Sequence, residues 1–68
     1  MLSFTLFQSV KSPDLFCAVP EDRAVPDFIA AEGWAFGGKL GSDPPLGFNQ
    51  QAAETSAHFN GFYLFQRV

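Results

Sequence analysis

Apolar and polar residues alternate at the start of the chain, where Leu2, Phe4 and Leu6 are separated by polar residues. A period of two is typical of a strand with one buried face, so we predict a strand over residues 2–10. A second apolar run occupies residues 15–19, after the turn-forming sequence Lys-Ser-Pro-Asp. A short turn between two such runs predicts an antiparallel hairpin.

The sequence after the hairpin predicts a short helix and a third strand. Pro26 suits the first turn of a helix, and Asp27 lies where a negative charge is stabilised by the helix dipole. Gly33 can adopt a positive φ and end that helix. We therefore predict a helix over residues 26–31 and a strand over residues 34–40, weakened by two adjacent glycines.

A second helix and a fourth strand are predicted after the loop of residues 41–45, which is rich in Gly, Ser, Asp and Pro. Asn49 is a favoured N-cap residue at the start of an alanine-containing segment. The Asn60-Gly61 pair is typical of a helix C-terminus. These signals predict a helix over residues 49–59 and a strand over residues 62–68.

The order of these elements predicts an α+β fold: a small four-stranded, mainly antiparallel sheet in ββαβαβ order, with two short helices on one face. The 68 residues form a single small domain, 1–68, in this interpretation. Each of the last two predicted strands follows a helix and a glycine and begins with an aromatic residue. Because the two strands match in this way, we assign Trp34, Phe36, Phe62 and Leu64 to the same face, the one covered by the helices. The predicted core consists of Phe4, Leu6, Leu15, Cys17, Ile29, Trp34, Phe36, Phe59, Phe62 and Leu64.

Composition favours a compact, acidic chain that does not bind nucleic acid. Nine residues are Phe, which supplies apolar material that disordered chains lack. The net charge is -3, and the four basic residues are scattered along the chain. Binding to phosphates or to an anionic membrane surface requires clustered Lys and Arg, so we expect neither partner.

Cysteine usage and the N-terminus indicate a cytoplasmic protein. One cysteine cannot form a disulfide within the chain, and small secreted domains usually depend on disulfides. Residues 1–10 lack the basic segment and the cleavage site of a secretory leader. No apolar run approaches the length of about 20 residues that a membrane-spanning helix needs.

Catalytic chemistry is poorly represented, and we expect no catalytic, metal or cofactor site. Cys17 lies among apolar residues, which favour the protonated thiol, and no base is near it in the sequence. His58 lies near the end of the second predicted helix, where a positive charge is mildly stabilised. One His and one Cys cannot complete a zinc site without carboxylates.

The remaining hypothesis is a protein-interaction surface on the sheet. If both helices cover one face, the alternation leaves several aromatic side chains on the other face, with two basic residues as a polar rim. This surface comprises Phe7, Phe16, Tyr63 and Phe65, with Lys39 and Arg67 at its edge. Exposed aromatic patches are typical of protein interfaces, so we expect a non-enzymatic module that forms a homodimer or binds another protein. The alternative is a small-ligand-binding protein or minor enzyme with a pocket between the sheet and the loop of residues 41–46.

The charge distribution gives a first testable expectation. At micromolar protein concentration, the chain should not change the electrophoretic mobility of DNA or RNA, because it lacks the positive charge that supplies most non-specific binding. A mobility shift that weakens as the salt concentration rises would contradict this expectation.

Overall fold

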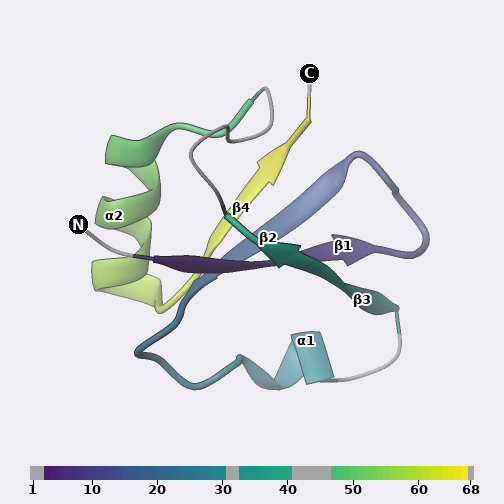
Figure 1. The fold of residues 1–68 in the computed structure, drawn as a ribbon, viewed down its shortest axis with the longest axis horizontal. Coiled ribbons are helices and arrows are strands. Elements are labelled where there is room, and N and C mark those ends of the chain that lie inside the picture. The colour runs from purple at the N-terminus through teal and green to yellow at the C-terminus, as the bar shows by residue number, and fades with distance from the viewer. Residues whose placement is uncertain (1–2, 31–32, 41–46, 68) are drawn as a thin grey trace.

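The computed structural model describes residues 3–30, 33–40 and 47–67, in which four strands and two helices follow one another in the order β1, β2, α1, β3, α2, β4 (Figure 1). Their bounds are Phe4–Ser9 for β1, Leu15–Pro20 for β2, Asp27–Ala30 for α1, Trp34–Lys39 for β3, Gln50–Asn60 for α2 and Tyr63–Gln66 for β4. The strands form one antiparallel sheet in the order β3-β1-β2-β4. The prediction of a small α+β fold with a four-stranded antiparallel sheet is confirmed.

The predicted hairpin joins β1 to β2, and local hydrogen bonds close its turn. The backbone N–H of Leu15 donates to the carbonyl of Ser12 at 2.8 Å, and the Ser9 hydroxyl oxygen accepts from the N–H of Ser12 at 3.1 Å. The Gln8 side chain donates to the carbonyl of Pro13 at 2.8 Å. These bonds fix the register in which β2 runs back along β1.

Helix α2 begins and ends where the sequence predicts. The Asn49 side chain accepts a hydrogen bond from the N–H of Ala52 at 2.9 Å, as an N-cap residue does. At the other end, Gly61 has a φ of 85°, and its N–H donates to the carbonyl of Ala57 at 2.9 Å. A left-handed glycine of this kind ends the helix and turns the chain directly into β4.

A β-bulge shifts the register between the edge strand β3 and β1. Leu6 pairs with Gly38, whereas Phe7 pairs with Phe36, so Gly37 is the extra residue on β3. A Cβ atom on Gly37 would lie 3.2 Å from the carbonyl oxygen of Leu6, which explains why a glycine fits this position. The glycine pair is therefore a built-in irregularity of the edge strand.

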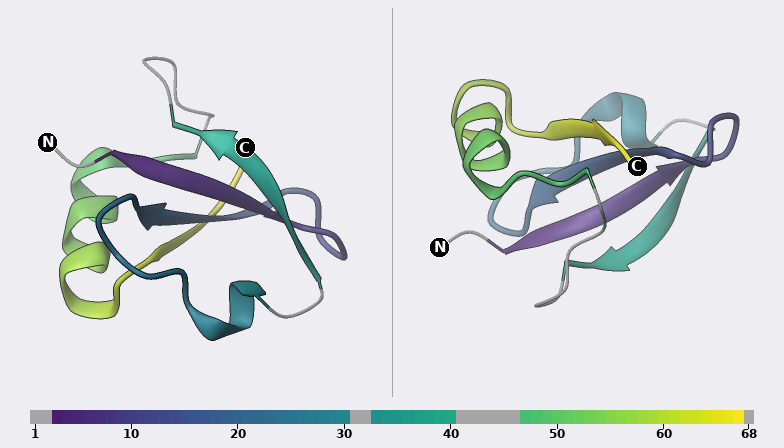
Figure 2. Two further views of the ribbon diagram at one scale, coloured as in Figure 1. Left: turned by 60° about the horizontal axis from the view of Figure 1, so that its bottom comes forward. Right: turned by 90° about the horizontal axis from the view of Figure 1, so that it is seen from above.

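The two helices lie on opposite faces of the sheet, which corrects the prediction that both lie on one face. Along β2, Phe16 and Ala18 pack in a cluster with Ala53 of α2, whereas Val19 packs in a second cluster with Ile29 of α1. Since side chains alternate between the faces of a strand, the two clusters lie on different faces. Figure 2 shows α1 and α2 well apart along the twisted sheet.

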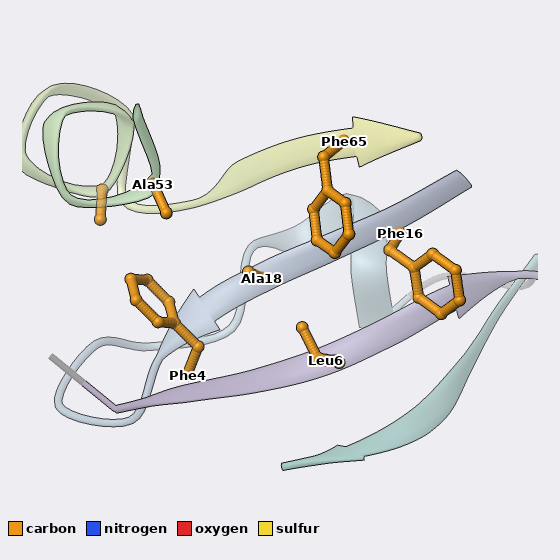
Figure 3. Packing of buried hydrophobic residues seen from close by; sticks show 7 residues of the cluster. Phe4, Leu6, Phe16, Ala18, Ala53 and Phe65 are labelled. Atoms are coloured by element: carbon orange, nitrogen blue, oxygen red, sulfur yellow. The ribbon is translucent and has the colours of Figure 1, made fainter. Parts of the chain in front are cut away.

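The larger cluster lies between the sheet and α2. Figure 3 shows large side chains of three strands directed toward the space that α2 closes with Ala53. The buried members of this cluster are Phe4, Leu6, Phe16, Ala18, Ala53, Ala57 and Phe65. The smaller cluster, on the other face, consists of Cys17, Val19 and Ile29, with Phe7, Trp34 and Phe62 half-buried around it.

Several predicted core residues are not buried. Phe36 is 68% exposed, Phe59 78% and Leu64 45%, whereas Leu15, Trp34 and Phe62 are half-buried. The buried stripe of α2 passes through Ala53 and Ala57. Two residues beyond Ala57, the helix has turned by about 200°, so Phe59 points away from the sheet.

The two environments of phenylalanine give a matched test of the core. Phe4→Ala should lower the free energy of unfolding by about 3–5 kcal/mol, because Phe4 is 0% exposed and its removal leaves a cavity. Phe59→Ala, the same change at a position that is 78% exposed, should stay within about 0.5 kcal/mol of the original protein. Denaturant unfolding of both variants measures the difference. Equal losses at the two sites would show that the core is elsewhere.

Candidate interaction surface

An apolar surface covers the face of the sheet opposite α2, and we call it the aromatic surface. Its members come from α1 and from the two edge strands with the residue before β4: Phe28, Trp34, Phe36, Phe62 and Leu64. Strand pairing places Phe36 beside Phe7, Phe7 beside Cys17, and Cys17 beside Leu64, so one row crosses all four strands. Phe28, Phe36 and Leu64 are 39%, 68% and 45% exposed, respectively.

Ring contacts hold this surface together around the short helix α1. The Phe28 ring lies edge-on to Trp34 at a centroid distance of 5.9 Å and to Phe62 at 5.0 Å. Phe7 and Phe36 meet in the same edge-to-face manner at 6.3 Å. Such geometry is favourable for aromatic pairs, so the rings form a defined surface rather than isolated side chains.

Helix α1 covers only the centre of this face. Ile29 is 5% exposed and packs over Cys17 and Val19, which are 0% and 1% exposed. The four-residue helix does not extend over Phe36 or Leu64, which lie on the two edge strands. The outer parts of the aromatic surface are therefore accessible in the monomer.

The aromatic residues that the sequence assigned to an exposed face are not gathered there. Phe16 and Phe65 are 7% and 6% exposed, and their rings stack at 5.6 Å in the cluster beneath α2. Tyr63 is half-buried on the same side and stacks on Phe65 at 5.5 Å. Phe7 lies on the opposite face, because it pairs with Cys17 and not with Phe16.

The two basic residues of the predicted rim are both exposed. Lys39 ends β3, and its Nζ lies 3.3 Å from a carboxylate oxygen of Glu21. Arg67 follows β4, and its backbone N–H donates to the carbonyl of Asp14 at 2.7 Å. Lys39 shares the face of the aromatic surface, because it pairs with Thr5, which in turn pairs with Val19.

The grouping of Trp34, Phe36, Phe62 and Leu64 on one face is confirmed. The prediction that both helices cover that face is wrong, since α1 lies on it and α2 covers the other one. Strand β2 explains the error: every residue from Phe16 to Pro20 is buried, so apolar and polar positions do not alternate along it. A strand that is apolar on both faces carries no signal for which side faces the helix.

A groove runs between α2 and β4, with a volume of about 730 Å³. Its α2 wall includes Ala52, Ser56 and Phe59, and its other wall is formed by residues 62–64. The Ser56 hydroxyl donates to the carbonyl of Phe62 at 2.6 Å and joins the two walls. The pocket predicted beside residues 41–46 lies outside the described residues.

The side chains with catalytic potential lie apart. Cys17 is buried in the sheet, and burial raises the pKa of its thiol from 9.0 to about 11, against a smaller lowering by a hydrogen bond with the Tyr63 backbone. His58 is exposed on α2, with its ring 5.0 Å from that of Phe59. Among residues 3–30, 33–40 and 47–67, no three His, Cys, Asp or Glu side chains gather as a metal-binding group.

The raised pKa of Cys17 predicts a slow thiol. Since the thiolate is the reactive form, a rise of two pKa units leaves about a hundredfold less of it at neutral pH than in the unfolded chain. The native protein should therefore react with a thiol reagent at least about a hundredfold more slowly than the denatured protein. Equal labelling rates with and without denaturant would show that the thiol is accessible.

The same group also makes stability depend on pH. The pKa of the Cys17 thiol is higher in the folded state than in the unfolded state. The contribution of the protonated thiol to stability is therefore complete below pH 9.0 and is lost as the pH rises toward about 11. Cys17→Ala, compared with the original protein across this range by denaturant unfolding, should show a smaller fall in stability. Parallel falls in the two proteins would contradict the assignment to Cys17.

Neither helix, within the part of the chain that the structure describes, combines the length and apolar character needed to cross a membrane. Comparison with known proteins gave no match to a family model, to a curated protein or to a solved structure.

Proposed function

We propose that this small α+β domain, with its ββαβαβ order of elements, is a non-enzymatic, cytoplasmic protein-interaction module that self-associates through the aromatic surface. The observation that carries the proposal is the exposure of Phe36, Leu64 and Phe28 on the face opposite α2. Several exposed apolar side chains on one face, on either side of a short helix, favour an interface at that face.

A second copy of the chain fits the chemistry of this surface. Two apolar surfaces of the same kind are complementary to each other in a two-fold dimer, where each residue meets the same patch on the partner. Phe and Trp are enriched in the buried centres of interfaces, and Lys39 can remain in the polar rim. Glu21 forms an ion pair with Lys39, so the rim carries one positive and one negative charge.

The side chains that would make the contact are already held in place. Phe28 contacts both Trp34 and Phe62, so these three rings lose little conformational freedom on binding. Phe36 is held on one side by Phe7 and is free on the other. An ordered aromatic surface of this kind favours association over a loose collection of exposed side chains.

Sedimentation velocity over a range of concentrations tests the proposal. The original protein should sediment as a dimer, and Phe36→Ser should weaken the dimer about tenfold or more, as expected for a buried aromatic contact. Phe59→Ser is the matched control, because it makes the same change at a 78% exposed position on α2, outside the aromatic surface. A monomer at all concentrations, or equal losses in the two variants, would refute this function.

A further inference from the structure

The free edge of β4 offers main-chain hydrogen bonds. Within the part of the chain that the structure describes, β4 lies at the end of the sheet and pairs with β2. The N–H of Arg67 donates to the carbonyl of Asp14 on the β2 side, and main-chain groups point alternately to the two sides of a strand. Phe65 and Tyr63 therefore direct their N–H and C=O groups to β2, whereas Leu64 and Gln66 direct theirs away from the sheet.

The groove lies along this free edge. Leu64, with its outward-facing main chain, lines the groove together with Phe59 of α2. Phe62, the residue before β4, also points its carbonyl to this side, where it accepts the hydrogen bond from Ser56. The groove, of about 730 Å³, is a solvent-open depression and not an enclosed pocket, and side chains of a bound segment can lie along it.

The residues that line the groove favour an uncharged ligand. Among the described residues that line the groove none is charged, and its apolar wall comes from Ala52, Phe59 and Leu64. Its polar side chains are largely used internally: Thr55 donates to the carbonyl of Gln51 at 3.0 Å, as Ser56 does to Phe62. A ligand therefore gains apolar contact and main-chain hydrogen bonds here, and few bonds to side chains.

The two edges of the sheet differ in how they are protected. Edge strands are usually shielded by bulges, charges or proline, which prevent pairing with other chains. β3 has such features, namely the bulge at Gly37 and the charged Lys39. β4, Tyr63–Gln66, has no charge, proline or bulge, and α2 bonds only to the carbonyl of Phe62 at its start, which leaves the outward groups of Leu64 and Gln66 for an added strand.

We propose that an extended, uncharged peptide segment of a partner protein adds to β4 as a fifth strand and places apolar side chains in the groove beside α2. Strand addition of this kind takes affinity from the main chain and specificity from side-chain pockets. A second copy that pairs edge to edge through β4 is the competing occupant, and hydrogen exchange at different protein concentrations, described below, distinguishes the two. The groove shares Phe62 and Leu64 with the aromatic surface, but the contact proposed here is made by the main-chain edge of β4 and by α2, and its occupant is a partner protein.

A synthetic peptide tests the site without knowledge of the natural partner. The probe is a capped peptide of about seven residues in which leucine alternates with threonine, a length typical of a strand. Titrated into the isotope-labelled protein, it should shift the amide signals of Leu64 and Gln66 and of the α2 groove wall, with a Kd of about 1 mM or tighter. It should also slow hydrogen exchange at the amides of Leu64 and Gln66.

An N-methylated analogue separates strand addition from simple apolar binding. It carries the same side chains, but methyl groups replace the N–H donors that would face β4. Loss of two or three hydrogen bonds should weaken binding about tenfold or more. Equal binding of the analogue, or no saturable shift with the original peptide up to about 5 mM, overturns the proposal.

Variants of the protein complete the test. Leu64→Pro removes an outward N–H at an edge position where proline is tolerated, and should abolish the peptide-induced shifts. Phe59→Ser should weaken peptide binding, whereas Phe36→Ser should leave it unchanged, the reverse of their expected effects on self-association. If Leu64→Pro does not fold, the N-methylated analogue gives the decision. In Phe36→Ser, which weakens the dimer proposed above, exchange at Leu64 and Gln66 that still slows with protein concentration alone would mean that a second copy occupies the edge, which also overturns the proposal.

Discussion

The burial of β2 on both faces is the constraint on which the rest of the structure depends. Residues Phe16 to Pro20 are all buried, although a strand in a small antiparallel sheet usually leaves one side in water. A strand of this kind needs an apolar cover above and below. α2 supplies one with Ala53 and Ala57, and α1 supplies the other with Ile29.

The two covers are unequal, and their inequality produces the exposed surfaces. α2 has 11 residues, and small alanine side chains let it approach the sheet closely. α1 has four residues and covers the middle of its face only. Since Phe36 of β3 and Leu64 of β4 lie beyond the reach of α1, both side chains remain in contact with water.

The sequence was sufficient to predict the helices and strands, but not which face of the sheet each helix covers. Local chemistry determines where an element begins and ends, so Asn49 and Gly61 marked α2 correctly. The choice of face depends on alternation, and β2 has none. Phe16 was therefore placed on the wrong side, together with Phe7, although the register pairs Phe7 with Cys17.

The exposure of Phe59 shows a related limit. Taken as a helix, the sequence allows one stripe through Phe48, Ala52 and Phe59 and another through Ala53 and Ala57. Hydrophobicity favours the first, but close packing of a helix on a sheet favours the second, because alanine leaves room for Phe4 and Phe65 beneath it. Phe48 instead packs as a neighbour of both rings, at centroid distances of 5.9 and 5.3 Å.

The burial of Ala53 and Ala57, and not of Phe59, also affects the groove. With the alanines turned inward, the larger side chain of Phe59 stays exposed, and it lines the groove together with Leu64. A helix that packed through Phe59 would bury this ring and remove the wall. The apolar groove at the open edge is thus a consequence of how the core is filled, and the small helix α1 leaves the second apolar surface on the other face for a different contact.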